Sequence, residues 1–330
     1  HEDPRRQRQM CIRDSCSTDK ERYLNGDEEL ERLINRDDVD IIVCATSGFA
    51  GLKTAYIASK TGKKILLANK ESIVVGGDLI LPLAKENNSE IIPIDSEHNA
   101  IFQCLSGEKG TEDVKSITIT ASGGPFINTS LQKLKHVTVE DALNHPNWKM
   151  GSKVTIDSAT LVNKCLELIE ARYLFDLDEK YFDLVIHPQS IIHSIVTYID
   201  GSSLCQMSAP DMRVPVAHAL SEENRIPIDF KDIDFSNLNL SFQEFPSDRF
   251  KIQDIAREVC NQGGFLGTVF NAANEVAVES FLNKEINFNE IYEVIYRTFD
   301  KNIMSKEVTI ESINEVDAQT RIHAQKVVKS

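Results

Sequence analysis

Short apolar runs alternate with helical periodicity along the first hundred residues. Glu28–Ile34 has the spacing of a helix, and Val39–Cys44 is a continuous apolar run typical of a buried parallel strand. The same alternation returns in four further segments: Gly51–Thr61, Lys64–Ala68, Leu79–Glu86 and Glu90–Ile94. This rhythm of helix and strand predicts a doubly wound α/β sheet.

The alternation continues beyond Asp95 and then gives way to helices. Runs typical of strands occur at Val114–Thr120, Leu184–Ile186 and His193–Tyr198, and a helix is predicted over Thr160–Phe175. A polar stretch follows Pro227. The remaining pattern is helical from Ile252 onward, with these segments: Ala272–Leu282, Phe288–Phe299 and Val316–Val328.

The predicted fold class is therefore α/β with a helical C-terminal domain. The expected parts are an incomplete Rossmann-like sheet over residues 20–94, a central α/β domain over 95–226, a linker over 227–247 and a helical domain over 248–330.

The beginning of the chain departs from the usual order of a nucleotide-binding fold. Such folds open with a strand that runs into a Gly-rich turn, but no GxGxxG motif precedes Val39. We therefore expect the first βαβ unit to be missing. The glycine pair of Gly48–Gly51 follows a predicted strand, but it is equally typical of a tight turn. Residues 1–15 have no apolar segment and no periodicity, so we exclude residues 1–19 as non-native or disordered sequence.

Composition and charge exclude several functional classes. The 330 residues carry 51 acidic and 36 basic side chains, a formal charge of -15. Because a nucleic-acid surface needs clustered Lys and Arg, no nucleic-acid partner is expected. The apolar runs are far shorter than the roughly 20 residues of a membrane span, so no membrane partner is expected. Seven scattered Cys without a CxxC pair indicate neither a disulfide framework nor a zinc cluster, and they favour a reducing cytoplasm.

Two carboxylates emerge where the strand predicted at Glu90–Ile94 ends. In an extended segment Asp95 and Glu97 would point the same way, at the edge of a parallel sheet where such folds bind ligands. Carboxylates held together repel unless a cation neutralises them, so an oxygen-ligated Mg²⁺ or Mn²⁺ site is one interpretation. Solvated loop charge is the other.

The segment from Asp157 to Glu167 begins with residue types that cap helices and continues with helical spacing. Asn163 and Lys164 precede Glu167 by four and three residues, so the three polar side chains can line one face. The apolar residues of the segment would face a core: Leu161, Cys165, Leu168 and Ile169. A functional face and an ordinary surface ion pair both fit this pattern.

Two loops carry further candidates. Adjacent glycines after Ser122 allow backbone N–H groups to converge on an anion, and with Ser158 and Lys164 they would form a phosphate cradle. An ordinary turn has the same pattern. The only Trp of the chain, Trp148, lies in a loop before a strand-like run at Lys153–Ile156. It fits either a core anchor or a lid that closes over a ligand.

Eight collinear blocks carry a resemblance that extends from about Asp27 to the C-terminus. The blocks are LLANKES (Leu66–Ser72), IDSEHNAIFQ (Ile94–Gln103), ASGGPF (Ala121–Phe126), HPNWKMG (His145–Gly151), IDSATLVNKCLELIEARYLF (Ile156–Phe175), HPQSIIHS (His187–Ser194), PDMRVPVAHAL (Pro210–Leu220) and NAANEVAV (Asn271–Val278). In this order they resemble the 1-deoxy-D-xylulose 5-phosphate reductoisomerase family. Cys165 and Lys149 differ from the residue types that are usual in the family's motifs, and neither position is a ligand of the site.

The resemblance implies a set of site residues. It makes Asp95, Glu97 and Glu167 the ligands of Mg²⁺, Mn²⁺ or Co²⁺, which suits a hard cation. The residues that it implies for catalysis and substrate binding are Lys70, Ser96, Glu97, Ser122, His145, Ser158, Asn163, Lys164 and Glu167. Those that it implies for the phosphate are Ser122, Ser158, Asn163 and Lys164. Those that it implies for NADPH are Asn69, Lys70, Glu71, Gly151 and Met212.

The activity that the resemblance implies is conversion of 1-deoxy-D-xylulose 5-phosphate to 2-C-methyl-D-erythritol 4-phosphate. The metal would polarise the substrate carbonyl while the carbon skeleton rearranges, and NADPH would reduce the resulting aldehyde. The family also implies a homodimer and a flap around Trp148 that excludes water.

Two alternatives to this activity remain open. Because the Gly-rich N-terminal unit is absent, the chain could bind metal and substrate without turnover. A metal-dependent sugar-phosphate aldolase or hydrolase would use the same carboxylates without nicotinamide, although the block at Leu66–Ser72 would have no role in it.

Overall fold

The chain divides into two units, His1–Asp40 and Ile41–Ser330. The computed structural model describes residues 26–108, 110–148, 150–221, 224–230, 232–246, 251–299 and 307–330. In the described part of the first unit, helix α2 (Asp27–Ile34) has acidic residues in its first turn and Arg32 in its last, as the helix dipole favours. The expectations for residues 1–19 and for Lys149 lie outside the described residues.

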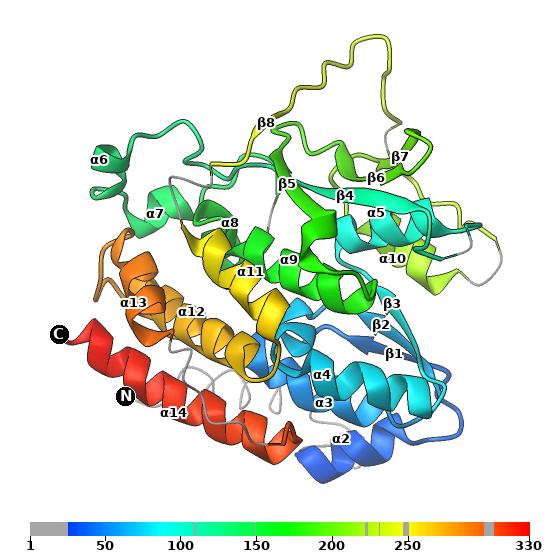
Figure 1. The fold of residues 1–330 in the computed structure, drawn as a ribbon, viewed down its shortest axis with the longest axis horizontal. Coiled ribbons are helices and arrows are strands. Elements are labelled where there is room, and N and C mark those ends of the chain that lie inside the picture. Colours follow the sequence, from blue (N-terminus) through cyan, green and yellow to red (C-terminus); the bar gives the residue numbers. More distant parts are fainter. Residues whose placement is uncertain are drawn as a thin grey trace, which may run out of the picture. The chain divides into compact units, whose positions relative to one another are not determined.

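A parallel sheet of three strands begins the second unit (Figure 1). Its strands, in spatial order, are β1 (Ile41–Cys44), β2 (Lys64–Leu67) and β3 (Glu90–Pro93). The segments between them form a 3-10 turn and two helices: η2 (Gly48–Gly51), α3 (Leu52–Ala58) and α4 (Lys70–Glu86). Three consecutive residues of β2 are buried, which explains its continuous apolar run. The three predicted strands are confirmed, whereas α4 begins nine residues before the predicted start at Leu79.

A mixed sheet of five strands follows. Its order is β7-β6-β4-β5-β8, with β4 and β5 parallel and the other neighbours antiparallel. The strands are β4 (Val114–Ala121), β5 (Phe182–Ile186), β6 (Ile192–Tyr198), β7 (Ser203–Met207) and β8 (Gln243–Glu244). The sequence did not reveal β7, whose first three residues are exposed, or β8, a two-residue strand within the predicted linker.

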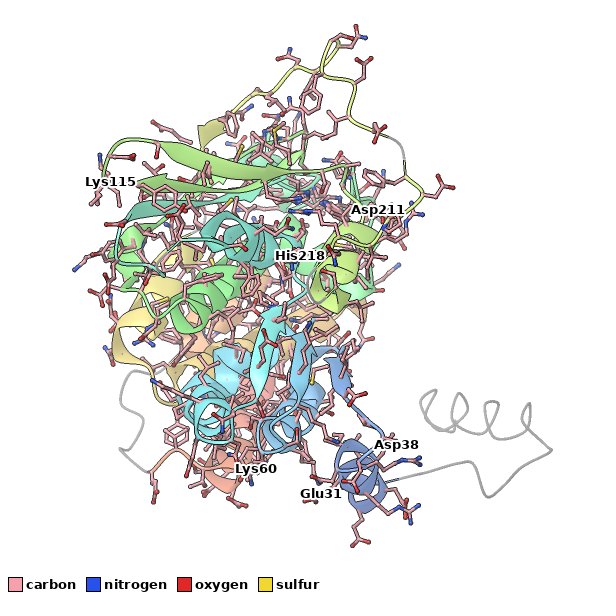
Figure 2. The ribbon with its side chains drawn as sticks, turned by 90° about the vertical axis from the view of Figure 1, so that its right-hand side faces the viewer. Glu31, Asp38, Lys60, Lys115, Asp211 and His218 are labelled. Atoms are coloured by element: carbon pink, nitrogen blue, oxygen red, sulfur yellow. The ribbon has the colours of Figure 1, made fainter. Side chains whose placement is uncertain are left out.

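Seven helical segments of the described residues accompany this second sheet. They are α5 (Ser96–Leu105), α6 (Leu131–Leu134), α7 (Val139–Ala142), α8 (Ser152–Ala159), α9 (Val162–Leu174), η3 (Glu179–Tyr181) and α10 (Arg213–Leu220). Of these, α5, α9 and η3 contact its strands. Figure 2 shows Lys115, which is exposed on β4, and His218 on α10, whose ring lies edge-on to Phe102 of α5. An apolar cluster centred on Leu66 and Ile92 joins α5 and α10 to the parallel sheet.

Two local predictions in this region are wrong. The run at Lys153–Ile156 is helical and belongs to α8, because its buried side chains pack against α12 and outweigh the strand preference of β-branched residues. The helix predicted over Thr160–Phe175 is confirmed as α9, but the residues from Asp157 that were expected to cap its start belong to the end of α8. Leu161 between α8 and α9 has a left-handed backbone, with φ 63°, so the two helices are separate.

The C-terminal part is helical, as predicted. Its helices are α11 (Ile252–Gln262), α12 (Leu266–Leu282), α13 (Glu290–Thr298) and α14 (Ile310–Val328). Helix α12 is buried along most of its length and contacts α4, α13 and α14 (Figure 1). None of the helices in the described ranges is long and apolar enough to cross a bilayer. The domain boundaries predicted at residues 94, 226 and 247 stay predictions.

Close backbone contact joins α12 to α4. Helix α4 is kinked at Gly76, and beside the kink the hydroxyl of Thr268 donates to the carbonyl of Val75 at 3.2 Å. Gly267 lies so near to α4 that a Cβ atom there would be 1.9 Å from the carbonyl oxygen of Val74. Only glycine therefore permits this approach.

We predict that Gly267→Ala destabilises the protein by about 3 kcal/mol, because the new methyl group must push two backbones apart. The matched control is Gly76→Ala, whose Cβ would come within 3 Å of the methyl end of Leu52 alone, at 2.8 Å, and would otherwise meet side-chain methyl groups at 3.4 Å or more. Its cost should therefore be below about 1 kcal/mol. Urea unfolding followed by circular dichroism measures both. Equal losses in the two variants would contradict this account of the contact.

Candidate active site

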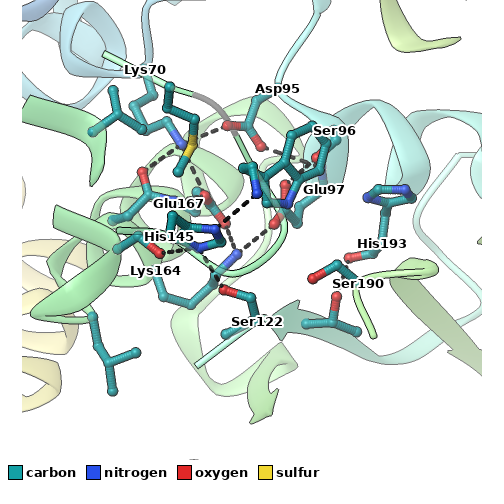
Figure 3. Close-up of a pocket in the computed structure, with 18 of the residues that line it drawn as sticks. Lys70, Asp95, Ser96, Glu97, Ser122, His145, Lys164, Glu167, Ser190 and His193 are labelled. Carbon is teal, nitrogen blue, oxygen red and sulfur yellow. Dashed lines mark hydrogen bonds and ion pairs between the residues drawn. The ribbon is translucent and has the colours of Figure 1, made fainter. Parts of the chain in front are cut away.

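Lys70 and Asp95 meet at the carboxyl ends of β2 and β3 (Figure 3). Lys70 is the first residue of α4, and Asp95 is the N-cap of α5, where its side chain accepts from the backbone N–H of Glu97. The Lys70 ammonium lies 2.5 Å from a carboxylate oxygen of Asp95 and 2.9 Å from one of Glu167. The extended geometry predicted for Asp95 and Glu97 is wrong, because this segment is a helix start.

The predicted polar face of α9 points into the same cluster. The Lys164 ammonium lies 2.6 Å from Glu97 and 2.5 Å from Glu167, and Asn163 donates to Glu167. Lys164 and Glu167 are 5% and 1% exposed, so this face is not a surface ion pair. The apolar residues predicted to face a core are all buried: Leu161, Cys165, Leu168 and Ile169.

Burial and charge oppose one another in this cluster. Burial disfavours the charged form of Lys70, but the carboxylates of Asp95 and Glu167 outweigh it and raise its pKa well above the ordinary value. Burial would also raise the pKa of Asp95, but Lys70 holds it well below its usual range. Glu167 is the exception, since burial and the neighbouring Glu97 raise its pKa although two lysines contact it. Additional positive charge beside Glu167 would therefore stabilise its charged form.

The donor set fits a divalent cation. Carboxylate oxygens of Asp95, Glu97 and Glu167 lie within 4.8 Å of one another. Three carboxylates against the two ammonium groups leave one negative charge in excess when all are ionised. Oxygen-only ligands of this kind suit Mg²⁺ or Mn²⁺ rather than zinc.

A buried histidine supports this set from behind. His98 donates from Nε2 to the backbone carbonyl of Glu167 at 2.9 Å, and its Nδ1 lies 3.1 Å from both Asp95 and Glu170. Burial opposes a charge on His98, but the carboxylates of Glu170 and Asp95 outweigh it and raise the pKa of the ring. The ring is thus held on both nitrogens and fixes Asp95 relative to α9.

His145 joins the two serines of the predicted phosphate cradle. Its Nε2 lies 3.2 Å from the hydroxyl of Ser122 and 3.1 Å from that of Ser158. Its Nδ1 accepts backbone N–H groups of Asn147 and Trp148, at 3.1 and 2.9 Å. Because Nδ1 is an acceptor, the neutral ring carries its proton on Nε2 and can donate it toward the serines or a ligand.

These groups line one cavity of about 240 Å³. Fourteen residues carry the site assignments, and eleven of them lie on the wall of this cavity. These eleven are Lys70, Asp95, Ser96, Glu97, Ser122, His145, Ser158, Asn163, Lys164, Glu167 and Met212. Trp148 also lines the cavity, so it is not solely a core anchor. The structure thus brings acidic, basic and hydroxyl groups from distant segments to one place.

Three sequence models of one enzyme family match the chain. The model described as 1-deoxy-D-xylulose 5-phosphate reductoisomerase matches residues 5–77. The model described as 1-deoxy-D-xylulose 5-phosphate reductoisomerase C-terminal domain matches residues 91–175, and the model described as DXP reductoisomerase C-terminal domain matches residues 207–323. The 1-deoxy-D-xylulose 5-phosphate reductoisomerase of Chloroherpeton thalassium is 46% identical over 299 residues, 90% of this chain and 77% of that protein. The chain belongs to this reductoisomerase family.

Solved structures of the family have the same fold. A DOX-P reductoisomerase in complex with NADPH, fosmidomycin and magnesium matches with a TM-score of 0.86 and 40% identity, over 93% of this chain and 80% of that one. The enzyme from Zymomonas mobilis in complex with NADPH matches with the same TM-score and identity, over 92% and 79%. The α/β fold class predicted from the sequence is therefore confirmed.

Three residues predicted to contact the cofactor lie outside the cavity wall. Asn69 caps α4 by accepting from the N–H of Ser72, and its amide donates to Glu71 at 2.9 Å. Glu71 also pairs with Lys153 at 2.5 Å. Gly151 is the N-cap of α8. In this structure Asn69 and Glu71 are engaged with the protein itself and shape the edge of the site.

Two polar residues of the cavity were not predicted from the sequence. Ser190 and His193 both line it, and His193 lies 3.0 Å from the hydroxyl of Ser208 and edge-on to Trp148. Burial lowers the pKa of His193, which favours the neutral ring. Both residues belong to the block at His187–Ser194, so the resemblance contained the signal although no role was assigned to them.

We predict that the loop at Trp148 loosens in acid. Burial lowers the pKa of His145 below its ordinary 6.5, so the neutral ring's contribution is complete above pH 6.5 and is lost as the pH falls through the lower value. Protonation of Nδ1 would break both backbone hydrogen bonds. Because Trp148 is the only Trp, its fluorescence should change with a midpoint below pH 6.5.

His145→Gln is the control, since it cannot titrate in this range and should abolish the change. A transition that persists in this variant would assign the titration to another group, such as His193, which contacts the same indole.

Proposed function

We propose that this chain converts 1-deoxy-D-xylulose 5-phosphate to 2-C-methyl-D-erythritol 4-phosphate with NADPH and a divalent metal, and that the cavity described above is its active site. The observation that carries this proposal is the convergence of Asp95, Glu97 and Glu167 with two lysines and two serines in a member of the reductoisomerase family. Acidic groups suit the metal, and basic and hydroxyl groups suit a sugar phosphate.

The acidic end would hold the metal through Asp95, Glu97 and Glu167. A bound divalent cation supplies Lewis-acid chemistry by polarising substrate oxygens. Lys70 offsets the charge of Asp95 and Glu167, and its ammonium faces the cavity beside them. His98 keeps the ligands in register from behind, so little reorganisation is needed when the cation enters.

The other end would hold the phosphate. Ser122, Ser158 and His145 can each donate one hydrogen bond, and the Lys164 ammonium adds a positive charge. Lys164 also lies 2.6 Å from Glu97, so it links the phosphate end to the metal end. The substrate would thereby be fixed at two points while its skeleton rearranges, which keeps the fragments aligned.

Met212 would contact the nicotinamide of bound NADPH, a cofactor that supplies hydride chemistry. Met212 lines the cavity and is 41% exposed, as a residue that packs against a nicotinamide ring requires. We also propose that Asn69, Glu71 and Gly151 contribute to cofactor binding, because they shape the edge of the site. Trp148 and its loop would cover the bound ligands and exclude water.

Turnover is the direct test of this function. Mixing the chain with NADPH, Mn²⁺ and 1-deoxy-D-xylulose 5-phosphate should oxidise NADPH in proportion to the substrate consumed. The comparisons offer no support for an inactive chain. Metal and substrate binding without NADPH oxidation would nevertheless restore that alternative, and substrate loss without NADPH would favour an aldolase or hydrolase.

We predict that Glu167→Gln weakens Mn²⁺ binding at least about tenfold, because ligand charge sets affinity at oxygen sites. Titration calorimetry measures the change. Glu140→Gln removes the same charge from an exposed residue and should bind as the parent does. Unchanged affinity in Glu167→Gln would refute its assignment as a ligand.

We further propose a homodimer in a reducing cytoplasm. Membership of the reductoisomerase family supports the dimer. The cysteines of the described residues support a reducing compartment, because none of the five forms a disulfide: Cys44, Cys104, Cys165, Cys205 and Cys260. Light scattering should give twice the 37.1 kDa mass of one chain. A single-chain mass at working concentrations would contradict the dimer.

A further inference from the structure

The block NAANEVAV at Asn271–Val278 has no role in the function proposed above. It forms the middle of α12, the buried helix of the C-terminal part. Two neighbouring side chains of this block leave the helix in different directions. Glu275 reaches the turn after β1, and Asn274 reaches α8.

Glu275 is bonded directly to the turn η2. One carboxylate oxygen accepts the backbone N–H of Phe49 at 2.8 Å, a contact between residues 226 positions apart. The preceding Gly48 has φ 70°, and a Cβ atom there would lie 2.7 Å from the same oxygen. The turn is therefore shaped against this carboxylate, and only glycine fits between them.

The other oxygen of Glu275 is held by α14. Arg321 lies 2.5 Å from it and 2.7 Å from Asp317, so the arginine is paired on two sides. Glu275 is 16% exposed in its side chain, which limits screening of these charges by solvent. The carboxylate thus has one fixed orientation, with one oxygen toward α14 and the other toward the turn.

The turn lies on the cofactor side of the site. It follows β1 at the carboxyl edge of the parallel sheet, where α/β folds bind ligands. The carbonyl of Gly48 accepts from the Asn69 amide at 3.1 Å, and the same amide donates to Glu71. Displacement of the turn would therefore disturb two residues proposed to serve NADPH.

Asn274 makes the matching contact on the substrate side. Its amide donates to Asp157 at 2.9 Å, and Asp157 directly precedes Ser158 in α8. Lys153, one turn earlier, pairs with Asp157 at 2.8 Å. Asn274 thereby holds the helix that presents Ser158 to the phosphate end.

We propose that Glu275 is a positioning residue for NADPH: its hydrogen bond to the turn at Gly48–Gly51 sets the cofactor-side edge, whereas Asn274 sets the substrate side. This assignment rests on the proposed function. Because Glu275 and Asn274 belong to the same helix, α12 fixes the cofactor side and the substrate side of the site relative to one another.

The test is NADPH affinity, measured by fluorescence titration without substrate. Glu275→Ala removes the acceptor for Phe49 and should raise the Kd about tenfold. Glu275→Asp keeps the charge beside Arg321, but its side chain is one methylene too short to reach Phe49, so it should lose a similar amount of NADPH affinity. This variant provides the test if Glu275→Ala fails to fold. Glu275→Gln keeps one acceptor oxygen for Phe49 but turns its NH2 group toward Arg321, so its loss of NADPH affinity should be smaller than that of Glu275→Ala.

Two further variants separate positioning from general damage. Glu279→Ala removes an exposed acid from the same helix and should leave NADPH affinity unchanged. Asn274→Ala should raise KM for the sugar phosphate several-fold more than it raises the Kd of NADPH. Mn²⁺ affinity by calorimetry should stay at the parent value in the Glu275 variants.

Two results would overturn the assignment. Folded Glu275→Ala and Glu275→Asp proteins with the NADPH affinity of the parent would refute it alone and leave the proposed function intact. Equal losses of NADPH, sugar-phosphate and Mn²⁺ binding would also refute it, by showing a merely structural role. Failure of the unmodified chain to bind NADPH would instead overturn the proposed function, and this assignment with it.

Discussion

Pairing of buried opposite charges is the constraint on which the site depends. Lys70 and Lys164 can be removed from water only because carboxylates contact each of them, and Glu167 contacts both. Each charge sits at the start of a helix or one turn into it, on α4, α5 and α9. Since no one of these charges is stable there alone, the three helix starts must meet at the edge of the parallel sheet.

The C-terminal helices make this meeting rigid. Helix α12 approaches α4 through Gly267 and bonds the carbonyl beside the kink through Thr268. About two turns later the same helix reaches α8 through Asn274 and the turn η2 through Glu275. Helix α12 has no residue on the cavity wall, but through these contacts it orients other elements that line or adjoin the cavity. Preorganisation of this kind matters most where charges must be held apart from water.

Prediction from sequence succeeded where a local pattern had a local cause. The buried strands β1, β2 and β3 are continuous apolar runs, and the C-terminal helices are periodic, so both were visible. It failed where packing overrode propensity, as in α8, and where a single backbone angle at Leu161 ended one helix and began another. It also missed β7 and β8, because short or exposed edge strands have no apolar period to detect.

The sequence by itself determined the α/β class, the family and the residue types of the site. The reason is that the order of the motifs, their spacing and the residues within them are properties of the chain alone. Only the tertiary structure decided that Asp95, Glu97 and Glu167 share one cavity with Ser122 and Ser158. It also decided that Asn69 and Glu71 face the protein and that Glu275 bonds a turn 226 residues away. The physical reason is that local patterns set local conformation, whereas contacts between distant segments depend on how buried surfaces and charges are jointly satisfied.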